Sequence, residues 1–397
     1  MNPDVLANIL EQEGVLTDEN VAQAFRAVPR HVFLPEVDAE TVYQNRAIYT
    51  ATDTLGGYTG GSDHPAQMAR MLTIAELEPG HNVLEIGTGT GYNAALLQHI
   101  VGDNGNVTTL EINRDTHDRA RDHLQRISVG SRINTVNADG AMGYSARSSY
   151  DRIISTVALW DVPPAWTRQL RPGGLIVAPV YMDGLQFCAA LEVADDDHLT
   201  ARALHTCSFV EMQGMEAPPP QYIYLGGGSA LRIYSNEARK IDSAALHMLL
   251  SNDAENCHLG VAPSNYEFWD GFIPYMMLNV PDGYDFVCYT VVGDKNVYGL
   301  EGSGFALIAQ SSAAFTGADL LGNTNCFAGV DAFLEIDSGY SKWVSAGSPH
   351  TDRIRLQLRP KQEPFDHNNG LLLGRRYHNL HIWLETGDNT DGERPPQ

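Results

Sequence analysis

A glycine-rich turn between an apolar run and a helical pattern is the strongest chemical signal in the sequence. Gly87, Gly89 and Gly91 follow the apolar residues 83–86 and come directly before a pattern typical of a helix. Glycine lets the backbone turn tightly and lets a ligand approach the main chain closely. Because ordinary strand-to-helix turns also contain glycine, the residues that follow have to decide between a binding site and a plain turn.

Acidic residues at the ends of the first three predicted strands point to a nucleoside ligand. Glu111 ends the second strand, where a carboxylate can accept hydrogen bonds from both hydroxyls of an adenosine ribose. Asp139 follows the third strand and would meet the adenine edge, while Glu85 would lie near an amino-acid ammonium. A dinucleotide would instead need the helix N-terminus free for its pyrophosphate. The set predicts S-adenosylmethionine, and its binding residues would be Glu85, Gly87, Thr88, Gly89, Thr90, Gly91, Glu111, Ile112, Asp139 and Gly140.

Five segments of the chain resemble the protein-L-isoaspartate O-methyltransferases. The most specific motif is V-P-R-H-V-F-L-P at residues 28–35. The matching stretches are residues 21–35, 79–112, 139–143, 150–154 and 170–174. The resemblance covers residues 15–213 and implies a Rossmann-like domain that uses S-adenosylmethionine. It further implies methyl transfer to a side-chain or isoaspartyl carboxylate of a peptide or protein, with S-adenosylhomocysteine as the product.

The same resemblance implies where the acceptor carboxylate would be held. Family members carry a serine in an S-x-P motif just before the helix that precedes the glycine-rich strand, and this serine approaches the acceptor. Here residues 60–65 read G-G-S-D-H-P, so one extra residue separates Ser62 from Pro65. Ser62 is the first candidate for the acceptor contact and Thr59 is the second. The alternative is that Ser62 and Asp63 only cap the helix that begins at Pro65.

Acid–base catalysis by the nearby His31 and His64 is not expected. A carboxylate has a pKa of about 4 and is ionised at neutral pH, so it attacks a methyl group without a general base. Catalysis would then consist of positioning and desolvating the acceptor.

A group of histidines near the C-terminus raises the question of a metal site. His367, His378 and His381 lie close in sequence to Asp366. Their spacing matches no familiar set of ligands, so we predict no metal.

The elements that must position these residues alternate between strands and helices. Apolar runs predict strands at residues 83–86, 107–112, 133–136, 152–156 and 175–180. Helical patterns separate most of them, and such alternation predicts a parallel sheet with helices on both faces. Residues 185–193 and 202–210 follow without a helix and would add an antiparallel edge. The predicted fold class is therefore α/β, with a Rossmann-like sheet.

A domain boundary is expected where prolines and glycines gather. Residues 218–220 are P-P-P and residues 226–228 are G-G-G, which is typical of a linker. We predict a catalytic domain at 1–213, a linker at 214–229 and a C-terminal domain at 230–397. Short apolar runs alternate with turns in the last part, which predicts a smaller α+β or mostly β domain that recognises the substrate.

Composition weighs against several classes of protein. The 397 residues are 43% hydrophobic and 19% charged, which suits folded domains with full cores. The net charge of −23 weighs against a nucleic-acid partner and against docking on anionic lipid. No apolar run is long enough to span a membrane, and the N-terminus lacks the pattern of a secretory signal. With five cysteines and no C-x-x-C pair, a cytoplasmic protein is expected.

The length of the chain favours one substrate class over another. Single-domain repair enzymes of the family are shorter, whereas enlarged bacterial relatives with an added C-terminal domain modify ribosomally made peptides such as lanthipeptides, lasso peptides and graspetides. We therefore predict methylation of an Asp or isoAsp side chain in such a peptide, followed by cyclisation of the ester to aspartimide. The alternatives are general repair of isoaspartyl proteins, and an adaptor that binds S-adenosylmethionine without transferring its methyl group. The oligomeric state is left open.

Overall fold

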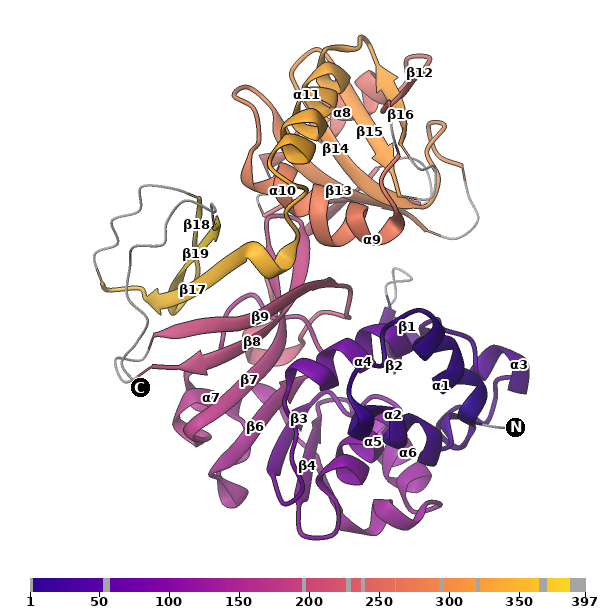
Figure 1. The fold of residues 1–397 in the computed structure, drawn as a ribbon, viewed down its shortest axis with the longest axis vertical. Helices are drawn as coiled ribbons and strands as arrows, with labels where there is room; N and C mark the ends of the chain where they lie inside the picture. Colours follow the sequence, from indigo (N-terminus) through magenta and orange to yellow (C-terminus); the bar gives the residue numbers. More distant parts are fainter. Residues whose placement is uncertain are drawn as a thin grey trace.

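The computed structural model describes residues 3–52, 58–194, 198–225, 230–236, 240–260, 262–292, 296–318, 322–363 and 370–385. Two large β-sheets, one toward each end of the molecule, organise it (Figure 1). A short hairpin of β1 (Ile48–Thr52) and β2 (Tyr58–Ser62) forms a third, separate sheet. No helix in these ranges is long and apolar enough to cross a lipid bilayer.

The larger sheet has ten strands in the order β18-β19-β17-β9-β8-β7-β6-β3-β4-β5. Its five parallel strands are β3 (Asn82–Ile86), β4 (Asn106–Glu111), β5 (Ile133–Asn137), β6 (Tyr150–Ser155) and β7 (Leu170–Met182). β8 (Leu185–Val193) and β9 (Leu199–Cys207) continue the sheet in antiparallel fashion. The predicted α/β sheet with an antiparallel edge is confirmed.

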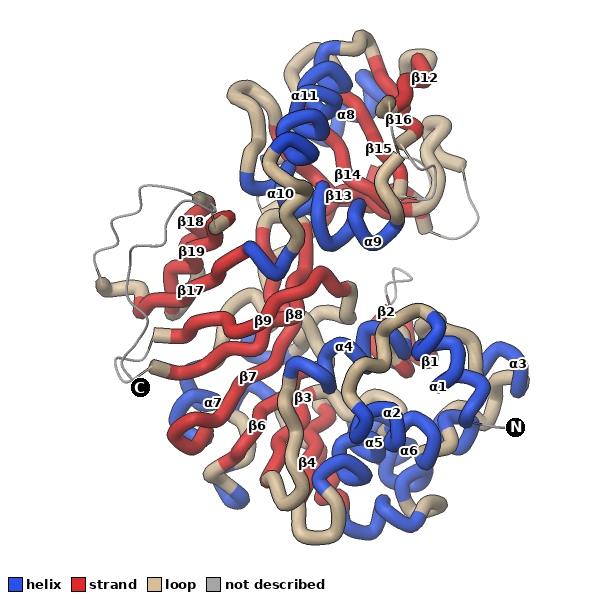
Figure 2. The backbone as a smooth tube through the Cα atoms, viewed as in Figure 1, coloured by secondary structure: helices blue, strands red, loops and turns tan. Residues whose placement is uncertain are grey.

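Helices cover both faces of this sheet, because successive residues of a strand point to opposite sides. Val83 belongs to an apolar core on one face and Leu84 to a core on the other. The helices of this part are α1 (Pro3–Gln12), α2 (Glu19–Ala27), α3 (Ala39–Val42), α4 (Pro65–Ile74), α5 (Tyr92–Val101), α6 (Arg114–Leu124) and α7 (Pro164–Gln169). The core with Val83 includes side chains of α1, α2, α4 and α5, whereas Trp166 of α7 lies in the other core. Figure 2 shows these helices in blue and the strands of the sheet in red.

The smaller sheet has seven antiparallel strands in the order β10-β11-β13-β14-β15-β16-β12. They are β10 (Tyr222–Leu225), β11 (Leu231–Tyr234), β12 (Glu255–His258), β13 (Asp285–Val291), β14 (Ser303–Ile308), β15 (Ala313–Gly317) and β16 (Asn323–Phe327). Its helices are α8 (Ser243–Leu250), α9 (Asn265–Glu267), α10 (Ile273–Leu278) and α11 (Asp331–Ser345). Leu246 of α8 packs in one core with Val287, while Ile336 of α11 lies in another core with Phe305. The second part is therefore rich in sheet, with helices on both faces.

The chain returns to the larger sheet after the smaller one is complete. Its last strands are β17 (Ile354–Pro360), β18 (Leu371–Gly374) and β19 (His378–Leu384). β17 pairs with β9, with Leu358 opposite Leu199, and Figure 1 shows these yellow strands beside β9. This arrangement differs from the predicted division, in which residues 230–397 form one separate domain. Without β17, β9 would be an exposed edge with unpaired backbone groups.

The two sheets also share one apolar core. Phe187 of β8, Phe286 of β13 and Leu358 of β17 belong to the same cluster of buried side chains. The predicted linker at 214–229 contains β10, so it is partly a strand of the smaller sheet. Each part also has a core of its own, but this shared cluster is built from side chains of both.

The buried carboxylate of Asp161 connects the C-terminal strands to the loop after β6 through hydrogen bonds. Asp161 is 3% exposed and accepts hydrogen bonds from the backbone N–H groups of Val162, Tyr377 and His378. Its Oδ1 also lies 2.6 Å from Nδ1 of His378, a residue 217 positions away in sequence. Because four donors converge on one buried group, its loss would leave all four without a partner.

Replacing this carboxylate should weaken the fold. In Asp161→Ala the converging donors lose a buried acceptor, so we expect the free energy of unfolding to fall by about 3–5 kcal/mol. Urea denaturation followed by circular dichroism measures the change. As a control, Asp103→Ala removes an exposed partner of Arg132 and should cost less than about 1 kcal/mol. Equal losses in the two variants would contradict the fastening role of Asp161.

Candidate active site

A pocket opens at the carboxyl ends of β3, β4 and β6, where the order of the larger sheet reverses. The chain places β4 and β5 on one side of β3, and β6 and β7 on the other. Open α/β sheets bind ligands at such a switch point. The pocket encloses about 740 Å³, part of it open to solvent. Most of its lining comes from residues 60–63, 86–90, 92–93, 110–112, 156–157 and 210–213.

The predicted cofactor residues fall into two groups. Those that line the pocket are Gly87, Thr88, Gly89, Thr90, Glu111, Ile112 and Gly140. Glu85, Gly91 and Asp139 lie outside the lining. The structure thus brings seven of the ten residues to one cavity and places three behind or beside its wall.

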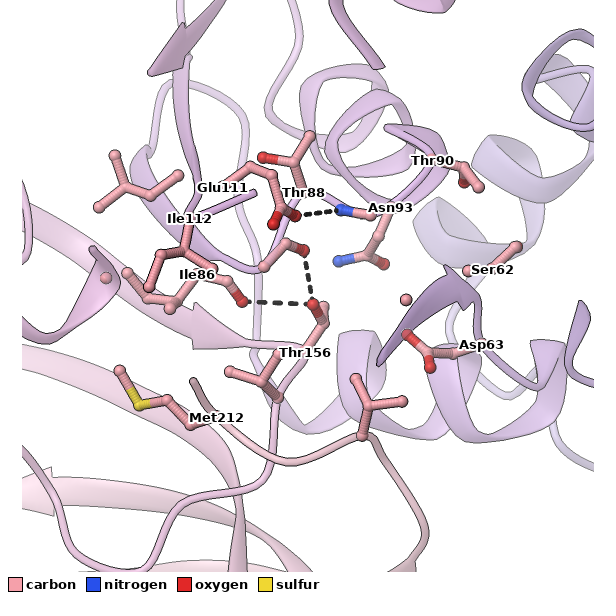
Figure 3. Close-up of a pocket in the computed structure, with 18 of the residues that line it drawn as sticks. Ser62, Asp63, Ile86, Thr88, Thr90, Asn93, Glu111, Ile112, Thr156 and Met212 are labelled. Carbon is pink, nitrogen blue, oxygen red and sulfur yellow. Dashed lines mark hydrogen bonds between the residues drawn. The ribbon is translucent and has the colours of Figure 1, made fainter. Parts of the chain in front are cut away.

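The pocket has two distinct ends. Figure 3 shows Glu111 and Ile112 on one side and Ser62 and Asp63 on the other. Of the two predicted acceptor contacts, Ser62 therefore lines the pocket. The side chain of Thr59 lies outside the described part of the structure.

The backbone of the turn requires its glycines. Gly87, Gly89 and Gly91 have φ angles of 93°, 55° and 91°, which residues with side chains rarely adopt. A Cβ on Gly87 would lie 2.7 Å from Oγ1 of Thr156, and one on Gly89 would lie 2.7 Å from the carbonyl oxygen of Gly61. The turn therefore presents bare main chain to the pocket, where a ligand can approach it closely.

Glu111 reaches across this turn from the end of β4. Its Oε2 accepts a hydrogen bond from the backbone N–H of Gly89 at 3.1 Å, and its Oε1 accepts one from Asn113 at 3.0 Å. Burial raises the pKa of the carboxyl, although these backbone donors oppose the rise. Each carboxylate oxygen has a second lone pair, so both oxygens can still accept from hydroxyl groups of a ligand.

Glu85 is buried behind the pocket and acts on it through Asn93. Its carboxyl accepts hydrogen bonds from Nδ2 of Asn93 at 2.9 Å and from the hydroxyl of Thr109. Burial raises the pKa of Glu85 to about 7. Asn93 lines the pocket, and its Oδ1 is buried without a partner among the described residues. Sequence analysis did not identify Asn93; the signal that could have done so is a polar residue in the first turn of the otherwise apolar α5.

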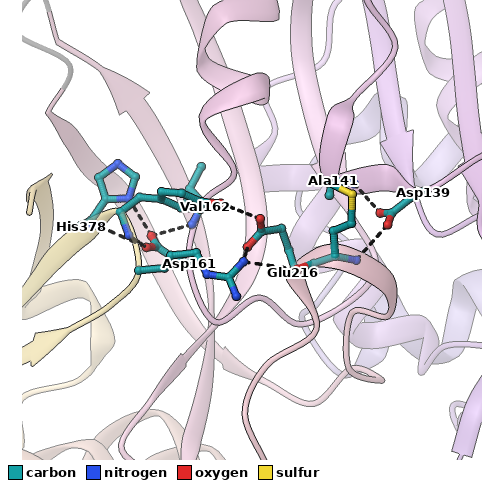
Figure 4. Close-up of polar contacts among 9 residues, drawn as sticks. Asp139, Ala141, Asp161, Val162, Glu216 and His378 are labelled. Atoms are coloured by element: carbon teal, nitrogen blue, oxygen red, sulfur yellow. Dashed lines mark hydrogen bonds and ion pairs between the residues drawn. The ribbon is translucent and has the colours of Figure 1, made fainter.

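Asp139 lies beneath a 3₁₀ turn that borders the pocket. Its Oδ1 accepts from the backbone N–H of Ala141 and its Oδ2 from that of Met215, each at 2.9 Å (Figure 4). The turn is Gly214–Glu216, and a Cβ on Gly214 would lie 2.3 Å from Oδ2 of Asp139. The carboxylate therefore positions this turn, and its contact with adenine stays a prediction.

Arg30 holds the end of the pocket that contains Ser62, the predicted acceptor end, in place, a role that sequence analysis did not assign. Its buried guanidinium donates to four main-chain carbonyls at 3.0–3.2 Å, those of Val42, Gln44, Arg46 and Asp63. Nε and Nη2 also donate to Oγ of Ser62, at 3.3 and 3.2 Å. Because Oγ accepts from Arg30, the hydroxyl proton of Ser62 can be donated to another group. In the sequence, the signal for a role of Arg30 was the V-P-R-H motif, but this motif does not indicate which groups Arg30 contacts.

The proposed capping role of Ser62 and Asp63 is wrong. The N-cap residue of α4 is His64, and no side chain at this position caps the helix. The backbone N–H of Ala66 receives its hydrogen bond from Oδ1 of Asn45 instead, at 3.0 Å. A residue distant in sequence thus satisfies the helix terminus and leaves Ser62 and Asp63 available to the pocket.

The C-terminal histidines have other contacts. His378 pairs with Asp161, and the ring of His381 stacks on Trp383 with centroids 4.4 Å apart. Asp366 and His367 lie outside the described residues. Within the ranges that the structure describes, no three His, Cys, Asp or Glu side chains are grouped so that they could hold a metal ion.

Comparison with known proteins assigns the first half of the chain. Residues 1–217 match the family model described as protein-L-isoaspartate(D-aspartate) O-methyltransferase. The protein-L-isoaspartate O-methyltransferase of Methanopyrus kandleri is 33% identical over 211 residues, which cover 53% of this chain and 91% of that protein. Protein-L-isoaspartate O-methyltransferase 2 of Archaeoglobus fulgidus is 34% identical over 209 residues, with coverages of 53% and 91%. A solved structure from Plasmodium falciparum, a protein-L-isoaspartate O-methyltransferase in complex with S-adenosyl-L-homocysteine, is 16% identical with a TM-score of 0.46 and covers 54% of this chain and 99% of its own.

The matched residues contain both ends of the pocket. They include the glycine-rich turn, Glu111 and Ser62, together with the segment 210–213 that completes the lining. Members of the matched family are S-adenosylmethionine-dependent protein carboxyl O-methyltransferases. The chain therefore belongs to the protein-L-isoaspartate O-methyltransferase family and is an enzyme of this kind.

Proposed function

We propose that this enzyme methylates the carboxylate of an Asp or isoAsp residue in a ribosomally made peptide, and that the ester then closes to aspartimide. The observation that carries the proposal is a single pocket with a nucleoside-binding end at Glu111 and an acceptor end at Ser62. Such a pocket brings a methyl donor and an acceptor into contact, and catalysis by positioning needs no more than that.

Several groups at the first end suit S-adenosylmethionine, which supplies an electrophilic methyl group when it is bound. Glu111 would accept hydrogen bonds from the ribose hydroxyls, beside the bare main chain of Gly87 and Gly89. The unpartnered Oδ1 of Asn93 would accept from the amino-acid ammonium, with Glu85 holding the amide in place. Asp139 would shape the adenine edge through the turn that it positions.

At the acceptor end, catalysis would depend on hydrogen bonding to the acceptor and on exclusion of water. Ser62 would donate its hydroxyl proton to the acceptor carboxylate while Arg30 fixes the position of its oxygen. One such charge-assisted hydrogen bond contributes about 1.5–3 kcal/mol. An acceptor oxygen forms a bond to the methyl carbon as the carbon–sulfur bond breaks, and no proton has to move.

The ester then reacts within the peptide itself. The backbone nitrogen of the following residue attacks the ester carbonyl, methanol leaves with the proton of that nitrogen, and a five-membered imide remains. Water can open the imide at either carbonyl to give Asp or isoAsp. The protein has to supply only the ester.

The second half of the chain supports a dedicated peptide substrate over general repair. The curated relatives are almost fully covered by the first half, so residues after 217 lie beyond the family match. These residues contact elements that border the site. Arg70 of α4 pairs with the buried Asp270 through two N–H···O contacts of 3.0 Å, and Glu216 accepts from the hydroxyl of Tyr377 at 2.7 Å. A peptide bound to the second half can therefore be placed relative to the pocket.

Glu111→Ala should weaken the binding of S-adenosylmethionine, because it removes the proposed acceptor of the ribose hydroxyls. We expect a loss of at least about tenfold in affinity, since even one charge-assisted hydrogen bond is worth that much. Isothermal titration calorimetry measures the affinity, and thermal melting checks that the variant is folded. Glu78→Ala, at a residue whose side chain is 76% exposed, is the matched control. An unchanged affinity in Glu111→Ala would reject the ribose contact.

Ser62→Ala should lower turnover more than it lowers affinity for S-adenosylmethionine. The lost hydrogen bond to the acceptor predicts a fall in kcat/KM for the peptide of about tenfold to a hundredfold. Transfer of a tritiated methyl group measures this value, and the exposed Ser131→Ala is the control. Full activity in Ser62→Ala would move the acceptor contact to another group.

The substrate class is tested by offering two acceptors to the full chain. One is a precursor peptide encoded beside its gene, and the other is a short isoaspartyl peptide of the kind used to assay repair. We expect mass spectrometry of the precursor to show the gain of one methylene and then the loss of methanol. Methylation of the isoaspartyl peptide alone would assign the enzyme to repair. Binding of S-adenosylmethionine with no methyl transfer to any peptide or protein would favour the adaptor.

A further inference from the structure

A second polar group lies beside Ser62 at the acceptor end of the pocket. Asp63 lines the pocket, and its carboxyl oxygens form no hydrogen bond or ion pair with another described residue. It does not cap α4, which begins after His64. A carboxyl group that faces a pocket and serves no structural contact is available to a ligand.

The charges around Asp63 are mostly negative. Arg30 is the nearby cation, but its Nη2 donates to the backbone oxygen of Asp63, 3.1 Å away, and not to the carboxyl group. Glu85 on β3 is an acid that interacts electrostatically with Asp63, and Glu111 on β4 and Glu211 after β9 line the same pocket. His64 adds no positive charge at neutral pH, because burial and Arg30 both lower its pKa. Burial raises the pKa of Asp63 to about 7, although Arg30 opposes the rise.

We propose that Asp63 binds the acceptor as a neutral carboxylic acid, donating its O–H to the carboxylate oxygen that does not attack the methyl group. This inference rests on the proposed function, since it needs a carboxylate acceptor in the pocket. Ser62 then donates to the same acceptor, so two hydroxyl donors orient one carboxylate. Asp63 touches the substrate in this arrangement and is a catalytic residue by position.

The sharing of one proton follows from the chemistry of paired carboxyl groups. Two carboxylates in one pocket repel each other, and the pair retains a proton where isolated groups would not. The proton stays on Asp63, because the acceptor has the ordinary acidity of an aspartyl side chain and Asp63 is the weaker acid of the two. The acceptor therefore keeps the negative charge that it needs as a nucleophile. When the ester forms, the acceptor loses its charge and the O–H of Asp63 can remain bonded to the ester carbonyl.

This arrangement predicts a characteristic pH dependence of kcat/KM for the peptide. Below about pH 7 Asp63 carries its proton in the free enzyme and can donate it; above this pH it becomes a carboxylate and repels the acceptor. The value of kcat/KM for the peptide should therefore be level from about pH 5.5 to about pH 7 and fall about tenfold for each further unit. Asp63→Asn keeps an N–H donor at every pH, so its profile should stay level. Asp63→Ala has no donor and should be slower than Asp63→Asn throughout.

The experiment measures methyl transfer from tritiated S-adenosylmethionine to a peptide acceptor by the full chain and these variants. Asp115→Asn, an exposed acid in the first turn of α6, is the matched control and should keep the wild-type profile. Calorimetry at each pH separates a change in cofactor affinity from a change at the acceptor. Because Glu85 also has a raised pKa, a fall that persists unchanged in Asp63→Asn would overturn the assignment to Asp63. A level profile in the wild type would overturn it as well.

A second measurement does not depend on activity. A carboxyl group whose pKa is higher in the folded than in the unfolded protein favours folding at low pH, and that contribution is lost as the pH rises toward 7. Asp63→Asn should therefore melt at a higher temperature than the wild type at about pH 8 and show no such gain at about pH 4. The same difference at both values would contradict a neutral Asp63.

The two proposals fail in different ways. If the wild type binds S-adenosylmethionine but methylates neither an Asp nor an isoAsp peptide at any pH, the proposed function fails and the role of Asp63 fails with it. If methyl transfer occurs with a level profile, or with the same profile in Asp63→Asn, only the role of Asp63 fails.

Discussion

The guanidinium of Arg30 is a charge held out of water, and such a group must be satisfied by hydrogen bonds inside the protein. No described carboxylate lies within hydrogen-bonding distance, so main-chain carbonyls and the hydroxyl of Ser62 take that place. These acceptors come from residues 42–46, at the end of α3 and in the loop that follows it, and from residues 62–63, at the end of β2 and before α4. One side chain thus fixes three segments relative to each other. Because Arg30 donates to Oγ of Ser62 and to the carbonyl of Asp63, it also sets the direction in which Ser62 can donate its proton and the position of Asp63 at the pocket.

The constraint extends from the acceptor end into the second half of the chain. α4 begins just after Asp63, and Arg70 on the same helix pairs with Asp270. Asp270 is buried and also accepts from the backbone and hydroxyl of Thr206 in β9. On the cofactor side, Glu216 connects the turn held by Asp139 to Tyr377. The added residues are therefore part of the environment of the site and not a remote attachment.

The electrostatics of the pocket distinguish its two ligands. The buried Glu85 and the half-buried Glu111 suit a cationic cofactor, and the net charge of −23 adds no general attraction for an anion. We propose that an anionic acceptor is held by neutral donors, because the nearby cation Arg30 is already engaged with carbonyl groups. Hydroxyl groups, and a carboxyl group that keeps its proton, are donors that can bind a carboxylate without adding charge.

The sequence by itself determined the α/β sheet, the glycine-rich turn and the place of Glu111, because each of these features depends on a local pattern of a few residues. Apolar periodicity sets strands and helices, and only glycine tolerates the positive φ angles of Gly87 and Gly89. Tertiary structure alone decided the roles of Arg30 and Asn93, the loss of the capping role for Ser62, and the pairing of β17 with β9. These depend on contacts between residues far apart in the chain, where burial removes water and each polar group has to find a partner inside the fold. No local pattern records which distant carbonyl or strand edge that partner will be.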